Sequence, residues 1–126
     1  MVFDTDVFIW VQRGNDKAAD IIDNTDQRFL SIFTYMELLQ CAKNKAQHKV
    51  VKDFLSELNF IVLPITENIG HRASIYIEEY TLSSHLRAGD AVVAATAVEN
   101  NLPLVSGNRK HFRPIKDLKL KTFNPG

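Results

Sequence analysis

Residues 89–107, GDAVVAATAVENNLPLVSG, place a helix of small residues directly before a short apolar strand. The predicted helix spans Ala91 to Asn100 and the predicted strand spans Leu102 to Val105. Helical segments alternate with short apolar runs along the rest of the chain as well, which is typical of βαβ units. The sequence therefore predicts an α/β fold with a mainly parallel sheet.

The other expected elements follow the same alternation. Strands are predicted at Val2–Phe3, Phe29–Phe33, Phe60–Ile65 and, as a fifth, Leu118–Phe123. Helices are predicted at Thr5–Gln12, Asp16–Asp23, Tyr35–Lys43, Gln47–Leu58 and Ile69–Tyr80. No Pro/Gly/Ser-rich linker or repeat interrupts the pattern, and 126 residues suit one domain, so we expect a single domain over residues 1–126.

Composition excludes several classes of protein. Fifteen Lys and Arg balance fifteen Asp and Glu, so no overall field attracts nucleic acid or membranes, although six of the thirteen residues from 109 to 121 are basic. Cys41 is the single cysteine, and the four histidines lack zinc-site spacing, which argues against a disulfide scaffold or a zinc finger. The acidic start, with Asp4 and Asp6, does not resemble a signal peptide, and no apolar run nears about 18 residues. We expect a cytoplasmic protein without a membrane partner.

Acidic side chains follow the predicted strands. Asp4 comes after the first apolar run, Glu37 after the second, and Asp90 begins the helix before Leu102–Val105, which Asn108 follows. Ligands of open α/β sheets bind beyond the carboxyl ends of the strands, so these side chains should converge there. Converging carboxylates must take up a proton or share a cation, and oxygen ligands select Mg²⁺ or Mn²⁺. Such an ion activates water and neutralises phosphate charge, which indicates metal-assisted phosphodiester hydrolysis.

Each of these residues also has a purely structural interpretation. Asp4 and Asp90 suit helix N-caps, and Thr34-x-x-Glu37 fits a capping box. Asn108 beside a glycine suits a turn with left-handed φ. Convergence favours the functional interpretation, and a residue can serve both roles.

Four motifs in this order resemble the PIN-domain ribonucleases of the VapC toxin type: VFDTDVFIW followed by RGN, the Thr-x-x-Glu helix, GDAVVAATA and LPLVSGNRKHF. The resemblance covers the whole chain. It implies a PIN-like three-layer α/β/α fold, with about five parallel strands in the order 3-2-1-4-5 flanked by helices. It also implies a metal-dependent endoribonuclease toxin that uses Mg²⁺ or Mn²⁺, is neutralised by a cognate VapB-like antitoxin, and forms a homodimer through helices such as Ile69–Tyr80.

The resemblance assigns roles to individual residues. Asp4, Glu37 and Asp90 match the catalytic acids that hold the metal, directly or through water, and Asn108 is a further candidate oxygen ligand. Residues expected to accompany or orient these groups are Thr5, Asp6, Thr34 and Ser106. His111 stands where many relatives carry a fourth acid, which lowers the negative charge and favours one ion over two.

The resemblance also implies how substrate and partner are bound. Basic residues that are candidates for contacting the phosphates of a single-stranded RNA are Arg13, Arg109, Lys110 and Arg113. Water would attack phosphorus in line, the 3′ oxygen would leave, and the product would carry a 5′-phosphate. An apolar groove near residues 8–11 would receive an amphipathic segment of the antitoxin.

Two other functions compete with this hypothesis. Asp4 and Asp6 also fit the start of a haloacid-dehalogenase-like phosphatase, but Phe8 stands where that motif needs Thr or Val, and Ala91 and Ala94 stand where its later acids belong. The third possibility is a PIN-like module weakened in catalysis by His111, which binds RNA or antitoxin without turnover.

Overall fold

The computed structural model describes all 126 residues and contains one five-stranded parallel sheet. Its strands are β1 (Val2–Phe3), β2 (Phe29–Ser31), β3 (Ile61–Leu63), β4 (Leu104–Ser106) and β5 (Leu120–Thr122), in the order β3-β2-β1-β4-β5. The predicted α/β class and strand order are therefore confirmed.

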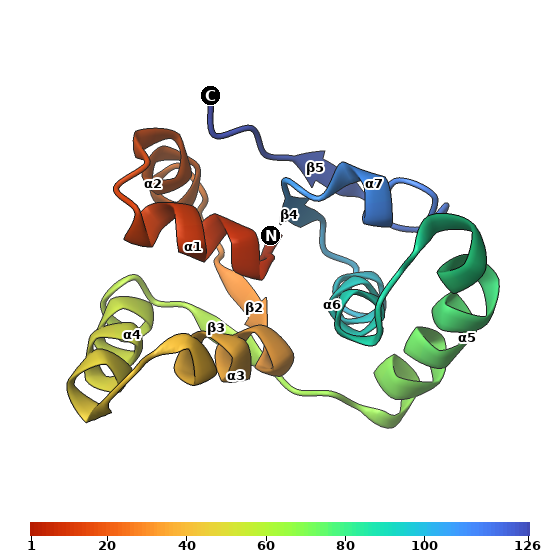
Figure 1. The fold of residues 1–126 in the computed structure, drawn as a ribbon, viewed down its shortest axis with the longest axis horizontal. Helices are drawn as coiled ribbons and strands as arrows, with labels where there is room; N and C mark the ends of the chain where they lie inside the picture. The colour runs from red at the N-terminus through yellow and green to blue at the C-terminus, as the bar shows by residue number, and fades with distance from the viewer.

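Seven helices surround this sheet: α1 (Thr5–Gln12), α2 (Asp16–Asp23), α3 (Ile32–Cys41), α4 (Lys45–Glu57), α5 (Glu67–Ser84), α6 (Ala88–Glu99) and α7 (Arg109–Phe112). In Figure 1, α1 to α4 lie on one side of the sheet and α5 and α6 on the other. The connection between α1 and α2 turns at Gly14, whose φ of +80° suits glycine.

Alternating strand side chains divide the core into two layers. Val2 and Leu104 pack in a cluster with α5 and α6, whereas their neighbours Phe3 and Val105 pack in a cluster with α1 to α4. Successive side chains of a strand point to opposite faces, and both faces here are covered by helices. This arrangement is the predicted α/β/α sandwich.

The predicted strand Phe29–Phe33 is wrong in its second half. β2 ends at Ser31, whose hydroxyl accepts a hydrogen bond from the Phe33 backbone N–H at 3.1 Å and so caps α3. The helix consequently begins at Ile32, three residues before the predicted start at Tyr35. Capping chemistry overrides the apolar run, because a serine that satisfies a free amide stabilises the helix end.

Other predicted boundaries shift by a few residues. β4 begins at Leu104, two residues after the predicted start at Leu102. Pro103 has no N–H to donate to a neighbouring strand, and it contributes only its carbonyl, which accepts from Val2 N at 2.8 Å. α5 and α6 begin earlier than predicted, at Glu67 and Ala88, and α5 runs on to Ser84. The four-residue helix α7 was not predicted from sequence at all.

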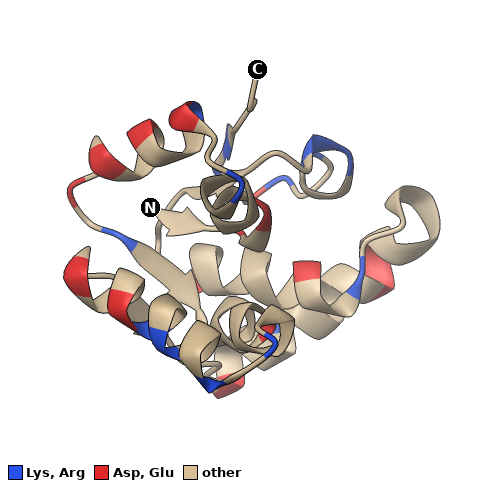
Figure 2. Ribbon diagram, turned by 60° about the vertical axis from the view of Figure 1, so that its left-hand side comes forward, with Lys and Arg blue, Asp and Glu red and all other residues tan.

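None of the seven helices combines the length and the hydropathy that a membrane-spanning segment requires. Acidic and basic residues are spread over the helices on all sides, as Figure 2 shows, so neither sign covers the molecule. Any functional concentration of charge is therefore local.

Candidate active site

A hollow of about 410 Å³ lies at the carboxyl ends of the central strands, and we call it the acid pocket. Its lining residues are Asp4, Phe33, Glu37, Arg87, Gly89, Asp90, Val93, Asn108 and His111. Asp4 directly follows β1, Glu37 lies on the helix after β2, and Asn108 follows β4. The structure therefore brings together the four residues that the sequence predicted to converge.

Asp4 is the most buried of the carboxylates, with 9% of its surface exposed. It caps α1, as predicted: one carboxylate oxygen accepts from the Thr5 backbone N–H at 2.9 Å, and the other accepts from the Ser106 hydroxyl at 2.8 Å. Burial, reinforced by the negative charges of Asp6 and then Asp90, raises the pKa of Asp4 to about 7. The ionised form of Asp4 thus lacks a compensating positive charge.

Glu37 is held by a hydroxyl. The side chain of Thr5 donates to Glu37 Oε1 at 2.6 Å, and Oγ1 of the fully buried Thr34 lies 3.4 Å from Thr5 Oγ1. The capping-box interpretation of Thr34 and Glu37 is wrong, because Ser31 is the N-cap and both residues lie inside α3. Glu37 is therefore free of a capping role, and its Oε2 accepts no hydrogen bond within the chain.

Asp90 occupies the third position of α6, so its predicted role as N-cap is wrong. The N-cap is Arg87, whose backbone N–H donates to Asp90 Oδ2 at 3.3 Å. The same oxygen lies 3.0 Å from Nδ1 of His111. Because a carboxylate can only accept, Nδ1 carries the hydrogen of this bond. The imidazole thereby fixes the orientation of Asp90.

Asn108 completes this group, since its side-chain amide lies 2.9 Å from the same Nδ1 of His111. That contact is made by the amide nitrogen, and a ring nitrogen that donates to Asp90 cannot also accept from this NH₂, so the two contacts are alternatives. The amide oxygen of Asn108 accepts no hydrogen bond within the chain and stays available to a cation or its water. Its φ of −86° shows that Asn108 does not use the left-handed conformation that it would tolerate in a turn.

Gly89 lets α6 approach α3 closely. A Cβ atom at this position would lie 2.6 Å from Cζ of Phe33, well inside contact distance. The absence of a side chain therefore allows the start of α6 to rest on the Phe33 ring. This packing places Asp90 and Glu37 in the same pocket.

Asp6 does not line the acid pocket, but it holds the turn after β4 against α1. Its Oδ2 accepts from the Gly107 backbone N–H at 2.8 Å, which ties the turn after β4 to α1. Its Oδ1 is buried and unpartnered, and burial raises the pKa of the carboxyl group above its usual range. With the Ser106 hydroxyl bonded to Asp4, this turn is joined to α1 at two points.

The pocket suits a hydrated hard cation. No three side chains of His, Cys, Asp or Glu lie close enough together to enclose a metal ion. Mg²⁺, however, usually keeps several waters and needs only one or two protein carboxylates. Three carboxylates without a Lys or Arg ion pair, one of them with a raised pKa, match that requirement.

The predicted phosphate-binding residues separate into two places. Arg109, Lys110, Arg113 and Pro114 line a second hollow of about 670 Å³ at α7 and the two residues after it, and α7 also contributes His111 to the acid pocket. Arg13 instead caps the far end of α1, where its guanidinium lies 5.3 Å from the centre of the Trp10 ring. The structure therefore does not bring Arg13 to the pocket.

Sequence reasoning missed Arg87, which does line the acid pocket. A signal was present, because Arg87 lies three residues before Asp90, a spacing that places the two on one helical turn. Because the helix was expected to begin at Ala91, Arg87 and Asp90 were not expected to share a helical turn.

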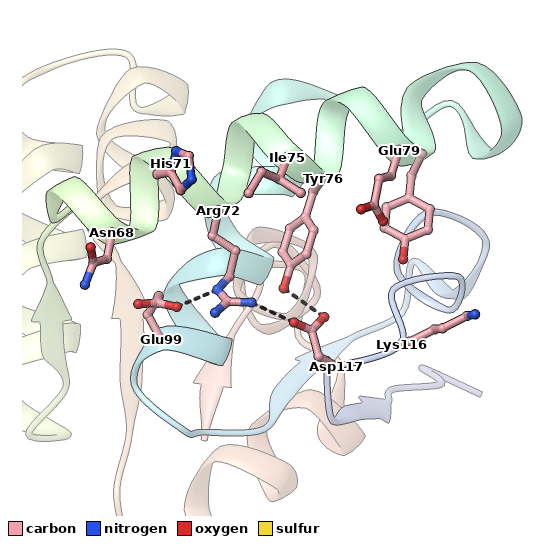
Figure 3. Close-up of a pocket in the computed structure, with 10 residues that line it drawn as sticks. Asn68, His71, Arg72, Ile75, Tyr76, Glu79, Glu99, Lys116 and Asp117 are labelled. Atoms are coloured by element: carbon pink, nitrogen blue, oxygen red, sulfur yellow. Dashed lines mark hydrogen bonds and ion pairs between the residues drawn. The ribbon is translucent and has the colours of Figure 1, made fainter.

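A hollow of about 600 Å³, larger than the acid pocket, lies beside α5, and we call it the α5 hollow (Figure 3). Three of its charged groups are paired within the chain: Arg72 binds Glu99 and, at 2.7 Å, Asp117, which also accepts from the Tyr76 hydroxyl at 2.9 Å. Glu79 and Lys116, which also line the hollow, form no ion pair. Burial, together with the Asp117 carboxylate, raises the pKa of Tyr76 to about 12. These bonds connect α5 to the end of α6 and to the segment before β5.

Comparison with known proteins identifies the family. The PIN domain model matches residues 1–117. Ribonuclease VapC1 of Methanocaldococcus jannaschii is 30% identical over 95 residues, which make up 75% of this chain and 69% of that protein. A chain in a toxin-antitoxin complex from Klebsiella pneumoniae is 27% identical with a TM-score of 0.81, and the match covers 99% of this chain and 97% of that one.

A more distant structure agrees in fold. One chain in the crystal structure of VapBC2 from Rickettsia felis, bound to a promoter DNA fragment, is 20% identical to this chain with a TM-score of 0.78. The match covers 98% of this chain and 100% of that one. These matches favour the PIN interpretation over the phosphatase alternative. The chain belongs to the PIN domain family and, within it, to the VapC toxins.

Proposed function

We propose that this chain is a VapC-type endoribonuclease toxin that hydrolyses RNA phosphodiester bonds with a divalent cation, Mg²⁺ or Mn²⁺, and is neutralised by an antitoxin. The observation that carries the proposal is the acid pocket, where three carboxylates meet without a Lys or Arg ion pair. The relative from Methanocaldococcus jannaschii, a ribonuclease, supports the same activity.

Asp4, Glu37 and Asp90 are the side chains that would hold the cation, directly or through water. Asn108 would contribute its amide oxygen, directly or through water, since that oxygen accepts no hydrogen bond within the chain. When bound, a divalent cation lowers the pKa of a water molecule and offsets the charge that develops on the phosphate. His111 adds no negative charge to the pocket, which favours a single ion.

The surrounding residues hold the carboxylates in place. Ser106 and the Thr5 backbone fix both oxygens of Asp4. The Thr5 hydroxyl occupies Oε1 of Glu37 and leaves Oε2 to orient the attacking water and accept its proton. The hydroxyl of buried Thr34 contacts the Thr5 hydroxyl and helps to hold it in place. Such outer contacts fix the reacting geometry.

The basic hollow at α7 is the proposed path of the RNA beyond the acid pocket. Its three basic side chains, Arg109, Lys110 and Arg113, form no ion pair with an acid. They are available to bind phosphates of the neighbouring nucleotides, whose contacts supply much of the affinity of nucleic-acid binding.

The antitoxin would occupy the apolar groove between α1, α3 and α4. Two adjoining hollows of about 290 and 60 Å³ share Leu38, Val50 and Val51, and the smaller also includes Phe8 and Val11. Val50 is 67% exposed, which is unusual for a valine that lines an apolar groove. These features suit the apolar face of an amphipathic helix. An antitoxin Arg or Lys in the acid pocket would compete with the cation.

Homodimer formation through α5 stays a prediction. Light scattering on the purified chain would decide it. A monomer at micromolar concentration would contradict it.

Cleavage of total RNA by the purified, antitoxin-free protein tests the proposed function. We expect discrete fragments with Mg²⁺ or Mn²⁺, and intact RNA with EDTA or with the Asp4→Asn variant. Asp20→Asn, which changes an exposed acid on α2, is the matched control and should cleave normally.

Intact RNA in every lane, from folded wild-type protein, would contradict the proposed activity. It would favour instead a module that binds RNA or antitoxin without turnover. Cleavage that persists with Asp4→Asn would place the chemistry outside the acid pocket.

A further inference from the structure

Arg87 is the one Lys or Arg among the residues that line the acid pocket. Its guanidinium forms no ion pair and no hydrogen bond within the chain, although Glu37 and Asp90 line the same pocket. In contrast, Arg72 in the α5 hollow is bound to two carboxylates. The Arg87 side chain is therefore a free cation at the mouth of an anionic pocket.

The backbone of Arg87 is fixed, whereas its side chain is exposed to solvent. Its N–H donates to Asp90 Oδ2 at 3.3 Å, and the residue forms the N-cap of α6. Two residues further on, Gly89 rests against the Phe33 ring. The Cα atom is thus held at the rim, and the long side chain can reach a ligand in the pocket.

The charges in the pocket require such a cation if a phosphodiester is to enter. Three carboxylates carry three negative charges, and a divalent ion leaves one of them uncompensated. The phosphodiester adds another negative charge. His111 already bonds to Asp90, and Arg109, Lys110 and Arg113 line a separate hollow. Arg87 is the remaining group that can offset this charge.

We propose that Arg87 binds the phosphate at which the RNA is cleaved; this inference rests on the ribonuclease function proposed above. A guanidinium presents two parallel N–H donors to the non-bridging oxygens of a phosphate. The interaction strengthens as negative charge builds on those oxygens during attack, so Arg87 contributes more to the transition state than to substrate binding. The role belongs to the side chain alone, because the backbone contact with Asp90 survives substitution.

The test compares Arg87→Ala and Arg87→Lys with Lys52→Ala, which removes an exposed, unpaired lysine on α4. We expect Arg87→Ala to lower kcat about a hundredfold with a smaller change in KM. Arg87→Lys should recover part of the loss, because it restores the charge without the paired donors. Melting temperature and Mn²⁺ affinity, measured by calorimetry without RNA, should match those of the wild type.

A second readout does not depend on turnover. Binding of a labelled single-stranded RNA is measured against salt concentration with Ca²⁺ in place of Mg²⁺, and gels confirm that the RNA stays intact. Loss of one phosphate contact should lower the slope of log affinity against log salt by about 0.7 for Arg87→Ala and leave it unchanged for Lys52→Ala.

Wild-type kinetics and an unchanged salt slope in Arg87→Ala would overturn the inference. So would a fall in Mn²⁺ affinity equal to the fall in kcat, because Arg87 would then act on the metal site. If the wild type cleaves no RNA, the proposed function fails, and the salt slope still decides whether Arg87 contacts phosphate.

Discussion

The acid pocket and the α5 hollow each contain three carboxylates, but only in the α5 hollow are two of the three paired with an arginine. There Arg72 binds Glu99 and Asp117, which joins three segments of the chain. In the acid pocket none of the three carboxylates has a Lys or Arg ion pair, and its arginine remains free. Carboxylates paired with an arginine serve the fold, whereas a cluster of carboxylates without a Lys or Arg partner marks a candidate ligand site.

The largest expected effect separates Glu37 from Glu79, the unpaired acid of the α5 hollow. Glu37→Gln should lower the rate of RNA cleavage by about a thousandfold, because the amide cannot take a proton from water or hold a cation through that oxygen. Glu79→Gln should leave the rate unchanged. Rates from gel-resolved fragments at saturating Mg²⁺ provide the measurement; equal rates would remove the distinction between the two hollows.

The second effect concerns the pH dependence of stability in metal-free protein. The pKa of Asp4 is about 7 in the folded chain against an ordinary value of 3.8, so the folded state binds more protons between these values. The free energy of unfolding should therefore fall as pH rises from 4 to 7, by no more than about 4 kcal/mol from this group. Urea unfolding of the wild type and Asp4→Asn at several pH values measures the difference between them.

If the variant loses as much stability as the wild type over that range, Asp4 does not carry uncompensated charge. We also expect Mg²⁺ to raise the melting temperature of the wild type above pH 7 and to have a smaller effect on Asp4→Asn.

A smaller effect is expected at Thr5, whose hydroxyl holds Glu37. Thr5→Val keeps the shape of the side chain and removes the hydrogen bond, so cleavage should slow about tenfold. This is the lower end of the loss expected when a group that orients a metal ligand is removed. Thr5→Ser, which retains the hydroxyl, is the matched control. A valine variant as fast as the serine variant would show that Glu37 needs no support from Thr5.

The smallest effect is expected in the α5 hollow. Arg72→Met removes both ion pairs but keeps the apolar stem, and it should lower the free energy of unfolding by about 1 kcal/mol, since the guanidinium is partly exposed. Cleavage should be unaffected. Urea unfolding and the RNA assay on the same preparation test both statements, and a loss of cleavage with unchanged stability would assign a function to this hollow.

Much of the fold follows from the sequence, because the alternation of short apolar runs with helical segments reports burial directly. Helix ends are less accessible. The apolar run at Phe29–Phe33 conceals the change from strand to helix at Ser31, which depends on a single capping hydrogen bond. The helix α7 has four residues, too few to show periodicity.

For the candidate site, topology was sufficient to place the acids, since the carboxyl ends of parallel strands meet at one edge. It was insufficient for Arg87 and for the His111–Asp90 bond. Both depend on α6 beginning at Ala88 and on Gly89 packing against Phe33, which are tertiary contacts. Arg13 failed for a different reason: α1 runs from Thr5 to Gln12 as predicted, and its length carries Arg13 away from the acid pocket.

Calorimetric titration of the metal-free protein with Mn²⁺ tests the contrast between the two hollows most directly. We predict that the wild type binds one ion per chain. Glu37→Gln and Asp90→Asn should weaken binding at least about tenfold, whereas Glu79→Gln and Asp117→Asn should not. Equal affinities across all four variants and the wild type would contradict the claim that the unpaired carboxylates of the acid pocket form the metal site.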